Sequence, residues 1–187
     1  MAKIFHVKGD LLDNDKNCCD VIVQQLNCLC VRGHGLSATI SNKYPYANVY
    51  KNRKAEGRKN LAILSDRPEP GTTVLSKPLL DNISNHHNFP IVAGIFGQYD
   101  FGKMNYKFYR PQYKVPETKQ LREDWFRSGL GLLNNWIINN NHNHNNFKIG
   151  FPYKIGCGLA GGDWNNYLKM IDDFSKLIDC QVWIYYL

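Results

Sequence analysis

Two glycine-rich stretches have the composition of loops that bind a ligand through their backbone. Residues 32–36 read Arg-Gly-His-Gly-Leu, and residues 155–163 contain four glycines within seven positions. Glycine loses more conformational entropy on folding than other residues and adds no side chain to a core, so this density predicts close approach of the backbone to another molecule. The second stretch lacks the Gly-Lys-Ser/Thr of a phosphate loop, and it lies too far along the chain for a Rossmann fingerprint.

Each loop is expected to join a strand to a helix. The apolar run at residues 21–26 predicts a buried strand before the first loop, and residues 147–151 predict a strand before the second. Apolar residues recur at helical spacing after both loops, first Leu36, Ile40 and Tyr44, and then Trp164, Leu168, Ile171, Phe174 and Ile178. A helix N-terminus carries unpaired N–H groups and positive potential, which suit phosphate. We therefore predict that the two loops hold a diphosphate between them.

The remaining segments alternate between strand and helix patterns. Strands are predicted at residues 3–7, 72–76, 91–99 and 180–187. A helix after Pro116 carries on one side Leu121, Trp125, Leu132, Leu133 and Trp136. The asparagine-rich tract at residues 139–146 ends that helix and is predicted to be a disordered surface loop. This alternation predicts a single α/β domain over residues 1–187, with a mixed central sheet between two helical layers in a three-layer α/β/α arrangement.

Composition narrows the class of protein. The 187 residues are 43% hydrophobic, enough for one core, and no apolar run has the length of a membrane span, so we expect a soluble, non-secreted protein and no membrane partner. The six cysteines lie in or beside apolar stretches, which favours reduced thiols in the cytoplasm or nucleus. We expect no metal and no cofactor. Asparagine and lysine richness is typical of an AT-rich genome, such as that of a large virus or a protist.

The chain is basic, with a net charge of +7 and a pI near 9.1, which favours anionic partners in general. The densest basic run, residues 43–59, also contains tyrosines. This run is either a solvated surface beside the core or a nucleic-acid surface, whose affinity would fall steeply with salt.

Three motifs make the chain resemble the macro domain family over nearly its whole length. They are residues 7–11 (Val-Lys-Gly-Asp-Leu), residues 27–36, and residues 152–159 (Pro-Tyr-Lys-Ile-Gly-Cys-Gly-Leu) with Trp164 downstream. The likeness is strongest to the small orphan macro domains, which include terminal ADP-ribose protein glycohydrolase and the ADP-ribose-1''-phosphate phosphatases. It implies the α/β/α macro domain fold. The implied partners are ADP-ribose, ADP-ribose-1''-phosphate, or ADP-ribosylated protein or nucleic acid.

The resemblance also implies positions for the ligand. Asp10 would accept the adenine amino group, Leu11 would lie beside the ring, and the terminal Leu187 would lie near it. Asn27 would face the distal ribose. The two loops would surround the diphosphate and the distal ribose with Arg32, Gly33, Gly35, Leu36, Lys154, Ile155, Gly156, Cys157, Gly158, Leu159, Ala160, Gly161 and Gly162.

The catalytic residues of the glycohydrolase are not matched here. Ala160 stands where that enzyme has its aspartate, and its lysine falls near Gly97 and Gln98. A covalent lysine–aspartate mechanism is therefore not expected, and Gln98 or Asp100 is predicted to line the distal-ribose cleft.

His34 is the main catalytic candidate, since an imidazole can act as acid or base near neutral pH, although it could instead only bind phosphate. Asp163 is the second candidate, with a helix N-cap as its alternative role. The reaction stays open between removal of the 1''-phosphate from ADP-ribose-1''-phosphate and cleavage of ADP-ribose from a macromolecule. A reader that binds without turnover is the alternative.

Overall fold

The computed structural model describes residues 4–13, 19–57, 60–78, 89–103 and 117–187. The elements run along these ranges in the order β1 (Ile4–Lys8), β2 (Val21–Asn27), α1 (Leu36–Lys43), the short 3-10 turns η1 (Pro45–Ala47) and η2 (Leu64–Asp66), β3 (Thr73–Ser76), β4 (Ile91–Gln98), α2 (Lys119–Asn139), β5 (Lys148–Pro152), α3 (Trp164–Lys176) and β6 (Gln181–Tyr186). No helix within these ranges is both long and apolar enough to cross a bilayer.

The strands form one six-stranded sheet in the order β1-β6-β5-β2-β4-β3. Every neighbouring pair is parallel except β3 and β4, which are antiparallel at one edge. β2 lies between β5 and β4 and is buried along almost its whole length, which explains its nearly continuous apolar sequence. The predicted mixed sheet is confirmed.

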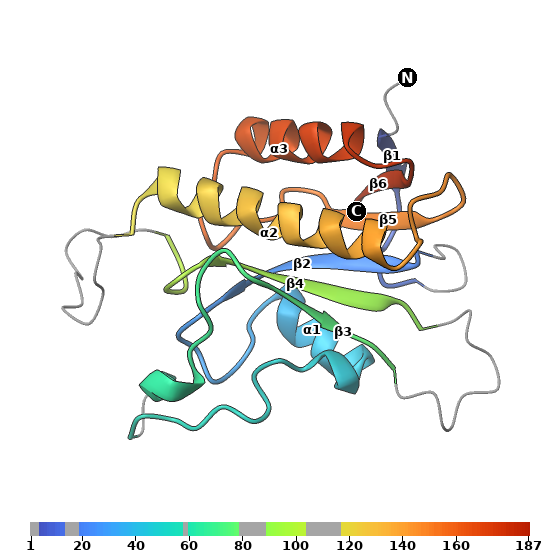
Figure 1. Cartoon of the computed structure of the whole chain (residues 1–187). Helices are drawn as coiled ribbons and strands as arrows, with labels where there is room; N and C mark the ends of the chain where they lie inside the picture. Colours follow the sequence, from blue (N-terminus) through green and yellow to red (C-terminus); the bar gives the residue numbers. More distant parts are fainter. Residues whose placement is uncertain (1–3, 14–18, 58–59, 79–88, 104–116) are drawn as a thin grey trace.

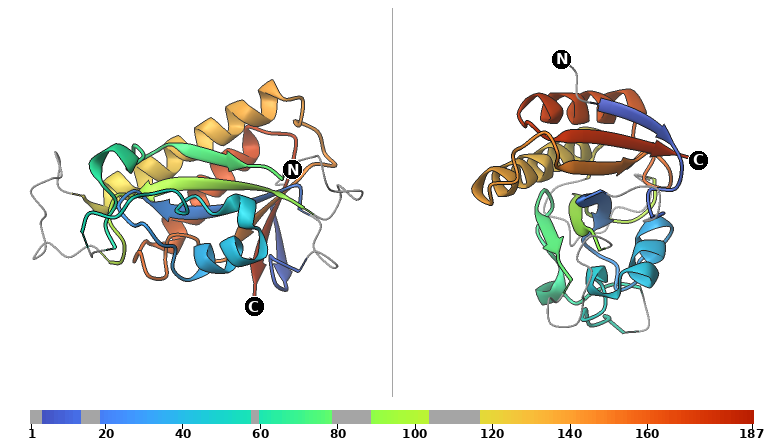
Figure 2. Two further views of the ribbon diagram at one scale, coloured as in Figure 1. Left: turned by 90° about the horizontal axis from the view of Figure 1, so that it is seen from below. Right: turned by 90° about the vertical axis from the view of Figure 1, so that its right-hand side faces the viewer.

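The helices cover both faces of the sheet. α2 and α3 lie on one face and α1 lies on the other (Figures 1 and 2). The larger core cluster joins α2 and α3 to the sheet, and a second cluster lies on the α1 side around Ile22, Ile40 and Tyr44. The structure therefore confirms the three-layer α/β/α prediction.

The buried face of α2 differs from the predicted apolar stripe. Its buried residues are Arg122, Phe126, Gly129, Leu130, Leu133 and Ile137. Leu132, which we had placed on the inner side, is 44% exposed. The reason is a close approach of α2 to the sheet at Gly129, whose carbonyl accepts a hydrogen bond from Thr73 Oγ1 at 2.8 Å. Because of this contact, the face of α2 that carries Gly129 and Arg122 is the one that packs against the sheet.

The prediction of a disordered loop after α2 was wrong. The ring of His142 stacks on Phe147 with centroids 4.7 Å apart and also packs on Trp136. The Asp179 N–H donates to Asn143 Oδ1 at 2.6 Å. Partial burial, with Lys77 nearby, lowers the pKa of His142 and so favours its neutral ring. Asparagines here bond to neighbouring backbone, which composition alone did not reveal.

The two glycines of α2 provide a matched test of its packing. A Cβ at position 129 would overlap Ile95 Cγ2 and lie 3.0 Å from Thr73 Oγ1, whereas a Cβ at position 131 would meet nothing within 4 Å. We expect Gly129→Ala to destabilise the protein by about 1–3 kcal/mol through overpacking. Gly131→Ala should stabilise it by about 0.5–1 kcal/mol, because alanine is the better helix former. Urea unfolding of both variants measures the difference, and equal stabilities would contradict the close approach.

Candidate functional site

Three neighbouring strands end at the same edge of the sheet. β2 lies between β4 and β5, and all three run parallel. The chain leaves β2 for α1 on one face and leaves β5 for α3 on the other. A crevice outside the carboxyl ends of strands opens where neighbouring connections diverge in this way, and open α/β sheets bind their ligands there.

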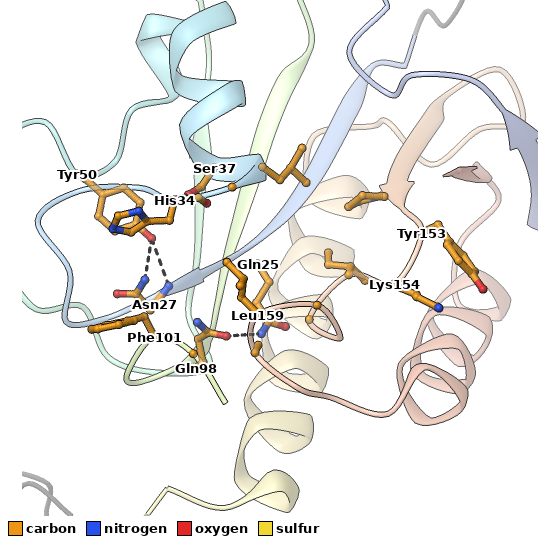
Figure 3. A pocket seen from close by; sticks show the side chains of 18 residues that line it. Gln25, Asn27, His34, Ser37, Tyr50, Gln98, Phe101, Tyr153, Lys154 and Leu159 are labelled. Carbon is orange, nitrogen blue, oxygen red and sulfur yellow. Dashed lines mark hydrogen bonds between the residues drawn. The ribbon is translucent and has the colours of Figure 1, made fainter. Parts of the chain in front are cut away.

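A cavity of about 760 Å³ occupies this position. Figure 3 shows His34 and Ser37 on the side of α1, Lys154 and Leu159 on the side of the second loop, and Gln25 and Gln98 between them. The full lining consists of Gln25, Asn27, His34, Gly35, Leu36, Ser37, Tyr50, Gln98, Phe101, Gly102, Pro152, Tyr153, Lys154, Ile155, Gly156, Gly158, Leu159 and Ala160.

Asn27 shapes the first loop rather than facing the cavity freely. Its Oδ1 accepts the Cys30 N–H at 2.7 Å, and its own N–H and Nδ2 donate to the Tyr50 hydroxyl at 3.3 and 3.4 Å. Burial raises the pKa of Tyr50 to about 12, so this hydroxyl keeps its proton at neutral pH. The Asn27 side chain and the protonated Tyr50 hydroxyl thus hold the first loop in its closed shape.

Arg53 binds the same loop from behind. Its Nη1 donates to the carbonyl oxygens of Cys28 at 3.0 Å and Cys30 at 2.8 Å, and its guanidinium stacks over the Tyr50 ring at 4.6 Å. Burial lowers the pKa of Arg53. The carbonyls of the loop are therefore held away from any ligand.

The N-terminus of α1 opens onto the cavity. Gly35 is the N-cap residue with a φ of 56°, and no side chain caps the helix. The first N–H groups of a helix have no partner within it, so those of Leu36 and Ser37 are available to a ligand. Ser37 Oγ instead accepts the His34 N–H at 3.1 Å and donates to the His34 carbonyl at 3.0 Å. This exchange holds His34 at the helix entrance.

The second loop borders the same cavity with several residues whose backbone N–H groups could bind a ligand. Its internal bonds run from Cys157 N to Lys154 O, from Gly161 N to Gly158 O and from Gly162 N to Gly156 O. Among the described residues, none accepts a hydrogen bond from the N–H groups of Gly156, Gly158, Leu159 or Ala160. All four residues line the cavity, so the loop forms a concave set of donors, as in anion-binding nests.

Gly156 cannot be replaced without disturbing the floor of the cavity. Its φ is +72°, and a Cβ there would lie 2.6 Å from Gln25 Oε1 and 2.7 Å from Tyr167 Cζ. Both Gln25 Oε1 and the Tyr167 hydroxyl are buried there. The floor is therefore polar and closely packed.

A bulge in β4 brings Gln98 to the cavity. Gln25 pairs with Ile95, yet Asn27 pairs with Gln98, so β4 has one extra residue between them. Without it Gln98 would point to the other face of the sheet. Gln25 Nε2 donates to Gln98 Oε1 at 3.0 Å, which leaves Gln98 Nε2 as the donor for a ligand.

Asn60 defines which nitrogen of His34 carries the proton. Asn60 Oδ1 accepts the Val31 N–H at 3.1 Å, so the atom 3.2 Å from His34 Nε2 is the amide nitrogen Nδ2. An amide nitrogen only donates, so His34 Nε2 accepts and the ring proton lies on Nδ1. The neutral form of the His34 ring therefore presents Nδ1–H.

The structure brings eleven of the residues named from sequence to the cavity wall. They are Asn27, His34, Gly35, Leu36, Gln98, Lys154, Ile155, Gly156, Gly158, Leu159 and Ala160. This lining does not include the other named residues, which are Asp10, Leu11, Arg32, Gly33, Asp100, Cys157, Gly161, Gly162, Asp163 and Leu187.

The residues outside the lining have local roles. Asp10 is exposed and accepts the Leu12 N–H at 2.9 Å, Leu11 is packed in the α1-side core, and Leu187 is 96% exposed. Asp163 is the N-cap of α3 and accepts the Asn165 N–H at 2.8 Å. Its carboxylate is thus used by the helix, which matches the alternative role we gave it.

Cys157 points away from the ligand space. Its thiol donates to the Ile155 carbonyl at 3.2 Å and packs against the larger core. Burial, and to a lesser degree the Asp163 carboxylate, raises the pKa of Cys157 to about 11. A thiol that stays protonated is a poor nucleophile. Cys157 and the other described cysteines are free of disulfides.

Seven lining residues are not among the ligand contacts named from sequence: Gln25, Ser37, Tyr50, Phe101, Gly102, Pro152 and Tyr153. Gln25 could have been identified from sequence, because a polar residue within an apolar strand indicates a role other than core packing. Tyr50 offered no such signal, because only the fold places it against Asn27.

The basic run at residues 43–59 is partly used inside the protein. Arg53 binds loop carbonyls, and Lys43 Nζ donates to the Leu12 carbonyl. The cavity lining itself contains Lys154 and His34 but, among the described residues, no carboxylate. No cluster of three or more His, Cys, Asp or Glu within the described ranges is arranged to hold a metal.

No protein-family model and no curated protein matches the chain. Solved structures match it over almost its whole length. The macrodomain of Mycobacterium tuberculosis DarG superposes with a TM-score of 0.63 at 17% identity, covering 98% of this chain and 97% of that one. The macrodomain of Thermus aquaticus DarG gives 0.62 at 15% identity, with 98% of each chain covered. A Trypanosoma brucei macrodomain in complex with ADP gives 0.57 at 13% identity, covering 99% of this chain and 64% of that one.

These likenesses extend over the sheet, the helices and the loops together. They agree with the resemblance found in the sequence motifs. The chain therefore has the macrodomain fold.

Proposed function

We propose that residues 1–187 act as one domain that binds ADP-ribose or a close derivative, and that it hydrolyses ADP-ribose-1''-phosphate. One observation carries the binding proposal. The start of α1 and the loop from Gly156 to Ala160 line a single cavity from two sides, and both carry N–H groups that have no partner among the described residues. Two sets of backbone donors suit the two phosphates of a nucleoside diphosphate.

Size and charge support the same ligand class. A volume of about 760 Å³ lies within the usual range for small-molecule sites. Lys154 and His34 are the basic side chains of the described lining, and none of its residues carries a carboxylate, which favours an anion. The ADP bound to the Trypanosoma brucei macrodomain is a ligand of this class.

The reaction proceeds by attack of water on the 1''-phosphorus. The bond between phosphorus and the sugar oxygen breaks, the sugar oxygen takes a proton, and inorganic phosphate and ADP-ribose are released. The attacking water is the source of that proton, and His34 Nδ1–H stabilises the charge on the leaving oxygen through a hydrogen bond. Gln98 Nε2 donates to a phosphate oxygen. Cleavage of ADP-ribose from a modified macromolecule is the second reaction open to this site.

A reader of ADP-ribosylated protein or nucleic acid is the alternative function. It is favoured by the absence of a carboxylate from the described lining, because no acidic residue there could activate water as a general base. The reader uses the same donors for binding and performs no chemistry.

Calorimetric titration with ADP-ribose tests the binding site. We expect a single saturable site. Gly158→Val should weaken binding by about tenfold or more, because a side chain blocks approach of the ligand to the backbone. The fold tolerates this change, since a Cβ at position 158 meets nothing within 4 Å. Gly131→Ala, on the outer face of α2, should bind like the wild type. The absence of heat and of amide shifts at millimolar ADP-ribose would refute the site.

Phosphate release from ADP-ribose-1''-phosphate tests the chemistry. We expect His34→Ala to lower kcat by about 100-fold or more, the usual cost of removing a hydrogen-bond donor to a developing negative charge, while the affinity for ADP-ribose changes little. Unchanged turnover would exclude a catalytic role for His34. If the wild type turns over neither this substrate nor ADP-ribosylated macromolecules, the reader is the correct function.

The tautomer of His34 can be measured directly. At a pH where the ring is neutral, ¹⁵N NMR should show the proton on Nδ1 in the wild type, because Asn60 donates to Nε2. Asn60→Ala should lose this preference while keeping the fold, since the Asn60 side chain contacts only the loop. A wild-type ring protonated on Nε2 would contradict the assigned role of Asn60.

A further inference from the structure

A buried ion pair lies behind the cavity, outside its lining. Arg122 Nε and Glu117 Oε1 are 2.8 Å apart, and the two side chains are only 4% and 8% exposed. Arg122 lies on the inner face of α2, and Glu117 directly precedes Thr118, whose Oγ1 caps that helix by accepting the Leu121 N–H. Both charges are therefore attached to the start of one rigid helix.

Glu117 binds the loop that follows β4. Its Oε1 accepts the Tyr99 N–H at 2.7 Å, and its Oε2 accepts the Asp100 N–H at 3.2 Å. These are charge-assisted bonds to the backbone immediately after Gln98. The carboxylate thus determines how the chain leaves β4 toward Phe101 and Gly102, which line the cavity.

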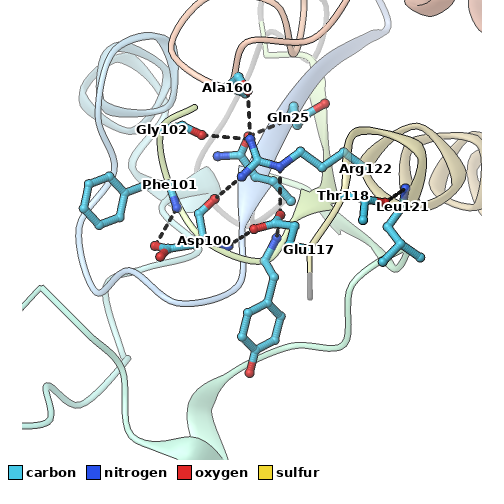
Figure 4. A network of polar contacts seen from close by, with 11 residues as sticks. Gln25, Asp100, Phe101, Gly102, Glu117, Thr118, Leu121, Arg122 and Ala160 are labelled. Carbon is cyan, nitrogen blue, oxygen red and sulfur yellow. Dashed lines mark hydrogen bonds and ion pairs between the residues drawn. The ribbon is translucent and has the colours of Figure 1, made fainter. Parts of the chain in front are cut away.

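Arg122 joins that loop to the second glycine loop. Its Nη1 donates to the Gly102 and Ala160 carbonyls, both at 2.8 Å, and its Nη2 donates to the Asp100 carbonyl at 3.4 Å (Figure 4). Gly102 and Ala160 come from different sides of the cavity. Among these contacts, only the Arg122 guanidinium bonds to both walls of the cavity. It therefore sets the distance between the two walls.

The bond to Ala160 also fixes the orientation of a peptide. The Ala160 carbonyl is bound to Arg122, and the N–H of the same peptide, which belongs to Gly161, donates to the Gly158 carbonyl. With both polar groups engaged, this peptide cannot turn its carbonyl toward the ligand. A carbonyl pointing inward would repel an anion and compete for the N–H groups.

Stability alone does not explain this arrangement. Removing two charges from water is costly, and well-packed apolar residues of similar volume often replace a buried ion pair without loss of stability. An apolar residue at position 122 could fill the space but could not bind three carbonyls. Only a planar group with several donors holds both loops at once.

We propose that Arg122, oriented by Glu117, is a positioning residue for the ligand, which holds the loop after β4 and the second glycine loop in the geometry that binds the diphosphate. This inference rests on the proposed function. It predicts that the pair affects affinity for the ligand beyond its effect on stability, although neither side chain lines the cavity.

The test uses three variants and one control. Arg122→Leu removes all the donors, Arg122→Lys keeps the charge with fewer donors, and Glu117→Gln keeps the shape of the acceptor without its charge. Ile137→Ala, a fully buried position toward the other end of α2, destabilises the core without contacting either loop. The melting temperature, the Kd for ADP-ribose and the amide hydrogen exchange of each variant are measured.

We expect Arg122→Leu to weaken ADP-ribose binding by about 10- to 100-fold, the range typical when a supporting partner of a binding group is removed. Arg122→Lys should recover part of the affinity, and Glu117→Gln should fall between lysine and wild type. The Tyr99 and Asp100 amides should exchange faster in Arg122→Leu and Glu117→Gln. Ile137→Ala should lose melting temperature and keep the wild-type Kd and these exchange rates.

Two results would overturn the positioning role. One is a wild-type Kd in both arginine variants, and the other is a loss of affinity in Ile137→Ala equal to theirs at the same loss of melting temperature. If the wild type does not bind ADP-ribose, the proposed function fails on its own. Amide exchange at Tyr99, Asp100 and Gly161 then decides the inference separately, because unchanged exchange in Arg122→Leu would refute it.

Discussion

A peptide N–H at the start of a helix or in a glycine turn has no partner inside the element that carries it. Around the cavity such groups come from two sides, from the first turn of α1 and from the loop after β5. Leaving them unpaired is tolerable only where water or a ligand can reach them. The crevice beyond the ends of β2, β4 and β5 satisfies this condition, and the sheet order creates it, because the chain leaves β2 and β5 toward opposite faces.

Two arginines bind carbonyl groups of the two loops. Arg53 binds carbonyls of the first loop, and Arg122 binds the Ala160 carbonyl of the second. Each guanidinium thereby satisfies acceptors that would repel an anion if they pointed toward it. Arg53 also adds positive charge behind the first loop, whereas the charge of Arg122 is balanced by Glu117. The basic composition of the chain is thus partly used for architecture.

The hydrogen-bonding roles of several polar side chains in the cavity are also set by their neighbours. His34 is held at the helix entrance by Ser37, and Asn60 donates to its Nε2. Asn27 donates to the Tyr50 hydroxyl, which keeps its proton because burial raises the pKa of Tyr50. Gln25 Nε2 donates to the side-chain oxygen of Gln98, which leaves the Gln98 amide nitrogen as a donor. The donor or acceptor roles of His34, Asn27 and Gln98 are therefore assigned by neighbours before a ligand arrives.

The resemblance to the macro domain family indicated most of the residues at the cavity wall. The sequence by itself determined the strands, the two glycine loops and the helices that follow them. These features depend on local signals, namely hydrophobic periodicity, proline stops and glycine density, which act within a few residues. Only the tertiary structure decided which face of α2 is buried, because that depends on the approach of Gly129 to Ile95 and Thr73. It also decided the roles of Tyr50, Arg53, Glu117 and Arg122. Their partners lie far along the chain, and a charged residue in a helix reads as solvent-exposed until the fold supplies the carbonyls that bind it.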